Sequence, residues 1–186
     1  RVQTRTDIAK LQSDLGVTTV YVTHDQVEAM TMGDRVAVMR DGVLQQVDTP
    51  QRLYDAPGNL FVASFVGSPP MNLMQARFSP QRGALLIGDA EIPLPADVPA
   101  THPGLKEYGG QDIAVGLRPE DVREAAGWDG ARLRGRVLLV ESLGSEQLVH
   151  IEVAAAPLER TDLLDAAAQP SGPALGGPGP EQAVTL

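Results

Sequence analysis

The sequence predicts an α/β segment over residues 1–67, followed by an all-β domain, a small barrel or sandwich, over residues 68–186. In the first part, stretches with helical periodicity alternate with short runs of β-branched residues, which is typical of α/β units. After residue 71 this periodicity nearly disappears, and short apolar runs are separated by Gly and Pro, as in small all-β domains. Ser68-Pro69-Pro70 interrupts the regular pattern, so we expect the domain boundary there.

The α/β segment is expected to open with a helix over residues 1–15. Gly16 follows it at the position where helices favour glycine. The apolar stripe of this helix comprises Ile8, Leu11 and Leu15. The run TTVYVTH, residues 18–24, is predicted to be a strand, because it is short, rich in β-branched residues and placed between two helical stretches.

A second helix is expected to begin after Asp25, whose side chain can cap it. Glu28 stands three residues on, in the reciprocal position of a capping box. Val27 and Met30 would form the buried side of this helix.

The remaining elements of the α/β segment are a hairpin and two short helices. RVAVM (35–39) and VLQQV (43–47) flank Asp41-Gly42, a strong signal for a tight β-turn. Thr49 followed by Pro50 is typical of a helix start, and FVASFVG (61–67) is expected to be a further short helix.

Several short strands are predicted in the second domain. The runs are ARF (76–78), ALLIG (84–88), EIPL (91–94), DIAVGLR (112–118), RLRGRVLLVESLG (132–144) and QLVHIEV (147–153). Residues 170–180 are mostly Pro and Gly and predict a loop or a disordered segment. The last four residues, AVTL, look like a strand that is cut off before its partner.

Composition excludes several classes of function. The net charge of -9 argues against binding of bare nucleic acid, which needs clustered cations. The absence of cysteine excludes disulfides and thiolate chemistry and suits a reducing, cytoplasmic setting. No apolar run is long enough to span a membrane, and the first residues do not resemble a secretory signal. Because the chain does not begin with Met, we expect it to be a piece of a longer protein.

His24 is the most informative candidate for chemistry. It ends the predicted strand and directly precedes a capped helix, the place where open α/β sheets bind their ligands. An imidazole there can hydrogen-bond to an anion such as a terminal phosphate. The alternative is a structural histidine that satisfies a loop carbonyl.

The stretch from TTVYVTHDQVEAM to GSPPMN, residues 18–72, resembles the end of the ATPase domain of ABC importers, and most closely the subfamily for maltose, other oligosaccharides and glycerol phosphate. GLRPED (116–121) and RGRVLLVESLGSEQLVHIEV (134–153) are similar to the C-terminal regulatory domain of that family. The resemblance weakens after about residue 154 and implies an OB-type barrel for residues 68–186. It also implies that His24 is the switch histidine, which contacts the γ-phosphate of ATP and the attacking water.

The other nucleotide-binding motifs of this family have no match in the sequence. Neither Lys10 nor Lys106 belongs to a P-loop, and LGSEQ (143–147) is not a signature motif. The Walker B strand and the glutamine-containing loop are also missing, and in the family all of these lie upstream. We therefore expect ATP and Mg²⁺ to act in the intact subunit, and neither a nucleotide nor a metal ion to bind this piece alone.

Other side chains carry weaker signals. His102 and His150 are isolated, and His150 is expected on the surface of the barrel. Three arginines alternate along one run, Arg132, Arg134 and Arg136. This spacing favours a solvated sheet face over an anion or partner site. Arg118-Pro119-Glu120 is expected to fix a turn, and Trp128 to cap the small core. The methionines expected to fill core gaps are Met30, Met32 and Met39.

The resemblance implies the ATPase subunit of an importer for sugars or related solutes. Such a subunit works as a homodimer held by its regulatory domains, beneath two permease subunits on the inner face of the membrane. The rival interpretation is a stand-alone module that senses a small molecule or docks a protein, without catalysis. The transported solute cannot be read from the sequence.

Overall fold

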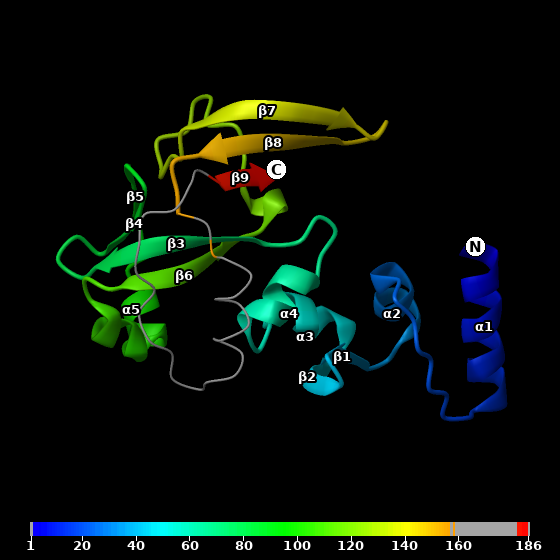
Figure 1. Cartoon of the computed structure of the whole chain (residues 1–186). Helices are drawn as coiled ribbons and strands as arrows, with labels where there is room; N and C mark the ends of the chain where they lie inside the picture. Colours follow the sequence, from blue (N-terminus) through cyan, green and yellow to red (C-terminus); the bar gives the residue numbers. More distant parts are fainter. Residues whose placement is uncertain (1, 157, 159–181, 186) are drawn as a thin grey trace. The chain divides into compact units, whose positions relative to one another are not determined.

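The computed structural model describes residues 2–156, 158 and 182–185. The chain divides into two compact units, Arg1–Ser68 and Pro69–Leu186. Figure 1 shows helices and one hairpin in the first unit, and mainly strands in the second. No helix among the described residues is long and apolar enough to cross a membrane.

The first unit opens with helix α1 (Val2–Leu15), as predicted. Gly16 ends it with a φ of 61°, a left-handed conformation that glycine adopts without steric cost. The expected apolar stripe is present but is not covered by the described residues, since Leu11 and Leu15 remain 59% and 61% exposed. Helix α1 contacts helix α2 (Gln26–Met32), beside which it lies in Figure 1.

The prediction of a strand over residues 18–24 is wrong for this structure. The backbone here is not paired with any described strand, and Val20 and Val22 are 88% and 89% exposed. A strand requires a hydrogen-bonding neighbour, and β-branched residues alone cannot supply one. The segment is therefore a connection between α1 and α2 that belongs to no described sheet.

The hairpin and its turn are confirmed. Strands β1 (Val36–Arg40) and β2 (Val43–Asp48) pair antiparallel. Asp41 and Gly42, with φ values of 49° and 78°, form the turn, and two successive left-handed residues match the twist of the strands.

Two short helices complete the first unit, each with the side-chain cap typical of a helix start. Thr49 caps α3 (Pro50–Asp55), and Asn59 caps α4 (Leu60–Phe65). Their inner faces and the hairpin form one core, whose fully buried residues are Val38, Leu53, Val62 and Val66. Met30 packs against this core as expected, whereas Met39 is 53% exposed and does not fill it.

In the second unit, a four-stranded antiparallel sheet has the order β5-β4-β3-β6. The strands are β3 (Asn72–Ser79), β4 (Ala84–Ile87), β5 (Ala90–Pro93) and β6 (Asp112–Leu117). The connection from β5 to β6 contains the short helix α5 (Val98–Thr101) and the 3-10 helix η1 (Pro103–Tyr108). Arg77 of β3 lies opposite Asp112 of β6. Arg77 Nε is 3.0 Å from Asp112 Oδ1, and the hydrogen bond to this carboxylate raises the pKa of Arg77.

A three-stranded sheet follows, in the order β7-β8-β9. Its strands are β7 (Gly135–Ser142), β8 (Gln147–Val153) and β9 (Gln182–Thr185). The C-terminal run is therefore a strand with a partner, β8, contrary to the expectation that it lacks one. Residues 170–180 lie outside the described residues.

One core joins the two sheets of the second unit. Its buried residues are Met74, Ala76, Ile87, Val153 and Ala155. The turn at Gly88 approaches the backbone of Ala154, and Gln75 N–H donates to Ala156 O at 2.9 Å. The described strands thus form two packed sheets rather than one continuous hydrogen-bonded barrel.

Trp128 does not cap the core as expected. It is 60% exposed, in the irregular segment between the 3-10 helix η2 (Pro119–Asp121) and β7. Gly127 has a φ of 74°, which is typical of a tight turn. The segment contains no helix or strand that could hold the indole ring against the core. The expectation that Trp128 caps the core is therefore wrong for this structure.

Candidate functional site

His24 lies at the bend between the extended segment 17–23 and helix α2. The residue is exposed, and within the described residues its ring makes no hydrogen bond. No described loop carbonyl accepts a hydrogen bond from this imidazole, and the residue is exposed. The ring is therefore available to a ligand.

The chain on both sides of His24 is held by hydrogen bonds. Asp25 Oδ1 accepts from Glu28 N–H at 3.1 Å, which is the predicted helix cap. Asp25 N–H donates to Thr23 Oγ1 at 2.9 Å, and the Thr23 hydroxyl donates to Glu28 Oε2 at 2.8 Å. Tyr21 Oη donates to the same carboxylate oxygen at 3.1 Å.

Helix α2 is also tied to the last helix of the first unit. Gln26 Nε2 donates to Phe65 O at 2.7 Å, at the end of α4. The loop that carries His24 is thus connected to its own helix and to the folded core of its unit. Such connections limit the conformations that the loop can adopt.

The other two histidines belong to the second unit. His102 is exposed, and its Nδ1 lies 2.9 Å from the Thr101 hydroxyl. His150 is half-buried in β8, with Nε2 3.7 Å from Glu141 Oε1 across the strand pair, so it is less exposed than expected. Among the described residues no group of three or more His, Asp or Glu side chains could hold a metal ion.

The three alternating arginines do not share one strand face. Only Arg136 lies in β7, because that strand begins at Gly135. Arg132 precedes it and donates to the backbone oxygen of Trp128. The alternation in sequence therefore does not continue as alternation in a sheet.

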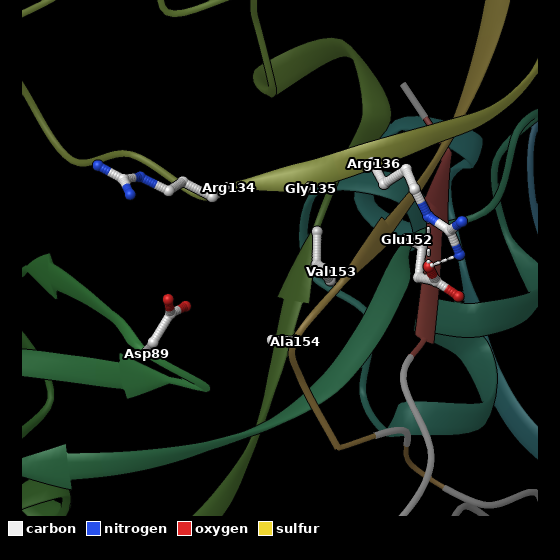
Figure 2. Close-up of a pocket in the computed structure, with 7 residues that line it drawn as sticks. All are labelled: Asp89, Arg134, Gly135, Arg136, Glu152, Val153 and Ala154. Carbon is white, nitrogen blue, oxygen red and sulfur yellow. Dashed lines mark hydrogen bonds and ion pairs between the residues drawn. The ribbon is translucent and has the colours of Figure 1, made fainter.

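A polar hollow of about 460 Å³ lies between Arg134 and Arg136 and the turn that joins β4 to β5. Its lining residues are Asp89, Arg134, Gly135, Arg136, Glu152, Val153 and Ala154. Figure 2 shows Arg136 paired with Glu152, with Nε and Nη2 at 3.0 and 2.5 Å from one carboxylate oxygen. On the other side Arg134 and Asp89 extend separately, and no ion pair joins these two described side chains.

Sequence reasoning missed Asp89. It reaches the hollow because the Gly88 turn brings β4 and β5 against the end of β8, a contact between residues more than sixty positions apart. No local pattern signals such a contact. Arg134 and Arg136 were singled out only by their spacing.

Arg118 is buried, with 8% exposure, which is unusual for a charged side chain. Its carbonyl accepts from Asp121 N–H at 3.0 Å, at the start of η2. This agrees with the expectation that the Arg118-Pro119-Glu120 stretch fixes a turn.

Two family models match the second unit. Residues 67–122 match the MalK OB fold domain, and residues 115–186 match the TOBE domain. These are the C-terminal domains of ATP-binding subunits of ABC transporters. The chain belongs with this MalK-type OB/TOBE region of carbohydrate ABC importer ATP-binding subunits.

The curated relatives carry the same assignment. The trehalose/maltose import ATP-binding protein MalK of Thermococcus litoralis is 49% identical over 161 residues, 82% of this chain and 42% of that protein. The diacetylchitobiose uptake system ATP-binding protein MsiK of Streptomyces coelicolor is 54% identical over 129 residues, 68% of this chain and 33% of that protein. The trehalose import ATP-binding protein SugC of Mycobacterium tuberculosis is 47% identical over 157 residues, which are 81% of this chain and 39% of that protein. The chain thus spans well under half the length of these relatives.

Proposed function

We propose that the protein containing this chain is the ATPase subunit of an ABC importer for sugars or related solutes. In this proposal residues 1–67 are the last segment of the nucleotide-binding domain, and residues 68–186 are the regulatory domain. The relatives named for trehalose, maltose and diacetylchitobiose support the solute class. The partners would be a second copy and two permease subunits, at the cytoplasmic face of the membrane.

The observation that carries the proposal is the setting of His24. It is exposed, precedes the capped helix α2 and stands within VTHD, the stretch that resembles the switch motif. ATP with Mg²⁺ would supply the phosphoryl chemistry when bound. The described residues fit one part of such a site only, a hydrogen bond from His24 to the γ-phosphate or the attacking water.

The contribution of His24 is positional and electrostatic. An imidazole N–H directed at a terminal phosphate favours the transition state, in which charge on the phosphoryl oxygens is redistributed. Because this bond matters most in the transition state, its loss should lower kcat more than nucleotide affinity.

The test is His24→Ala in the assembled transporter, with this chain joined to the upstream part of its own subunit or of the Thermococcus relative. We expect kcat for ATP hydrolysis to fall about 100-fold, with the KM for ATP changed less than threefold. His102→Ala is the matched control, because it removes another exposed imidazole from the second unit. Turnover near wild type in His24→Ala would make His24 a structural residue only.

The polar hollow favours a second candidate, a ligand-sensing module without catalysis. Arg134 and Asp89 present a cation and an anion that are not paired with each other, and these suit a ligand with both acceptor and donor groups. Calorimetric titration of the chain with sugars and with oxyanions separates the candidates. Saturable binding that Arg134→Ala abolishes would favour the sensing module.

A further inference from the structure

The carboxylate of Glu28 accepts hydrogen bonds from residues that precede His24 in the chain. One oxygen, Oε2, accepts hydrogen bonds from the Thr23 and Tyr21 hydroxyls at 2.8 and 3.1 Å. The Thr23 oxygen in turn accepts the backbone N–H of Asp25 at 2.9 Å. A single side chain therefore restrains positions 21, 23 and 25, and His24 lies inside this span.

The bond from Asp25 N–H to Thr23 Oγ1 bridges His24 directly. Short bridges of this kind, from a hydroxyl to the backbone two residues on, fix the conformation of the residue between them. The Thr23 hydroxyl has one hydrogen, and donating it to Glu28 directs its lone pairs toward Asp25. Glu28 thus sets the geometry of the bridge, although it does not contact His24.

This arrangement exceeds what a helix cap requires. The cap of α2 is the Asp25 carboxylate, which accepts from Glu28 N–H. The Glu28 carboxylate instead holds two side chains that precede the helix. Bonds to a charged acceptor are stronger than neutral ones, so this anchorage is firm even though it is partly exposed.

We propose that Glu28 is a positioning residue, which holds the backbone on both sides of His24 so that the imidazole is presented in one orientation. The inference rests on the proposed function, in which His24 contacts the terminal phosphate of ATP. A positioned ring needs no reorganisation when the phosphate arrives. Fixing the backbone of one residue is worth about one order of magnitude in rate.

The kinetic test uses the assembled transporter described above. Glu28→Ala should lower kcat about tenfold and leave the KM for ATP within twofold. Glu28→Gln keeps an acceptor oxygen and should lose only about threefold. Asp55→Ala is the matched control, because it removes a carboxylate that accepts a side-chain bond of 2.8 Å from Gln51 in the same unit, and it should leave kcat unchanged.

A double-mutant cycle distinguishes positioning from a purely structural role. If Glu28 acts through His24, the variant with both residues changed to Ala should be no slower than His24→Ala alone. Additive losses, or a Glu28→Gln variant as slow as Glu28→Ala, would overturn the proposal.

A second readout does not depend on turnover. In isotope-labelled chain, the amide order parameters at residues 23–25 should fall from about 0.85 to below about 0.6 in Glu28→Ala. Unchanged order parameters would overturn the proposal.

The outcomes for the two proposals remain separate. If His24→Ala leaves turnover intact, the proposed role of His24 is wrong, and Glu28 has no residue to act through. If His24→Ala abolishes turnover while Glu28→Ala has no effect, only the positioning role is wrong.

Discussion

At the scale of single residues, Gly88 decides how closely the two sheets of the second unit approach. Its φ of 57° is left-handed, and a Cβ at this position would overlap the carbonyl oxygen of Ala154. Both the backbone conformation and the contact therefore require glycine. We expect Gly88→Ala to destabilise the chain by about 3 kcal/mol, from left-handed strain and from forced separation of the sheets, measured by urea unfolding with circular dichroism.

Gly83 provides a control for this prediction. Its φ is 58°, nearly the same, but nothing lies within 4 Å of the position that a Cβ would occupy. Gly83→Ala therefore introduces the backbone strain alone and should cost about 1 kcal/mol. Equal losses for the two variants would show that the contact with Ala154 contributes nothing.

At the scale of elements, helix α4 depends on the residue before it. Asn59 Oδ1 accepts from Val62 N–H at 2.9 Å, and Asn59 Nδ2 donates to Gln45 Oε1 at 3.1 Å, so one side chain caps the helix and ties it to β2. Asn59→Ala should destabilise the first unit by about 2 kcal/mol, because both bonds are lost. Hydrogen exchange of the α4 amides measures this loss.

Thr49 is the matched cap for comparison. Its hydroxyl accepts from Arg52 N–H at a longer 3.4 Å and begins α3. A bond of this length is weak, so Thr49→Ala should cost only about 0.5 kcal/mol. If Thr49→Ala proves as harmful as Asn59→Ala, the bond to Gln45 has no energetic role.

The elements that the sequence predicted correctly depend on residues only a few positions apart. The Asp41-Gly42 turn and the caps at Asp25 and Thr49 are of this kind. The strand expected over residues 18–24 failed because pairing needs a distant neighbour. The hollow around Asp89 was missed for the same reason, since Arg134 comes from another part of the chain.

The candidate site divides in the same way. The position of His24 before a capped helix could be predicted locally, and the structure places it there. The bonds from Tyr21 and Thr23 to Glu28 could not be read from the sequence, because they depend on how the extended segment meets α2. The contact of His24 with a phosphate stays a prediction.

At the scale of the whole molecule, the negative charge is unevenly distributed. Residues 1–67 carry six basic and eight acidic side chains, whereas residues 68–186 carry nine and sixteen. Two copies that meet through the second unit therefore repel each other. This repulsion is screened within about 8 Å at physiological ionic strength.

Strand β7 supplies the opposing attraction. Among the described strands it lies at the edge of its sheet, it is exposed along its whole length, and it has a bulge between Val137 and Leu139. Its apolar residues are about half exposed on both faces, and they are Val137, Leu138, Leu139 and Val140. Exposed apolar edges favour association, and salt does not weaken apolar burial.

We therefore expect the chain to form dimers without ATP, and the dimer to strengthen as salt rises from tens to hundreds of millimolar. Sedimentation equilibrium across a salt series measures this dependence. Leu139→Glu should abolish the dimer, because it places a charge in the centre of β7, whereas Leu11→Glu alters an equally exposed leucine on α1 and should leave it intact. If the chain, at a protein concentration near 100 μM, stays monomeric at every salt concentration, its association is weaker than about -5.5 kcal/mol. That result would contradict the prediction and favour a monomeric sensing module. If Leu11→Glu abolishes the dimer and Leu139→Glu does not, the interface lies on the first unit, because the two variants differ only in which unit carries the new charge.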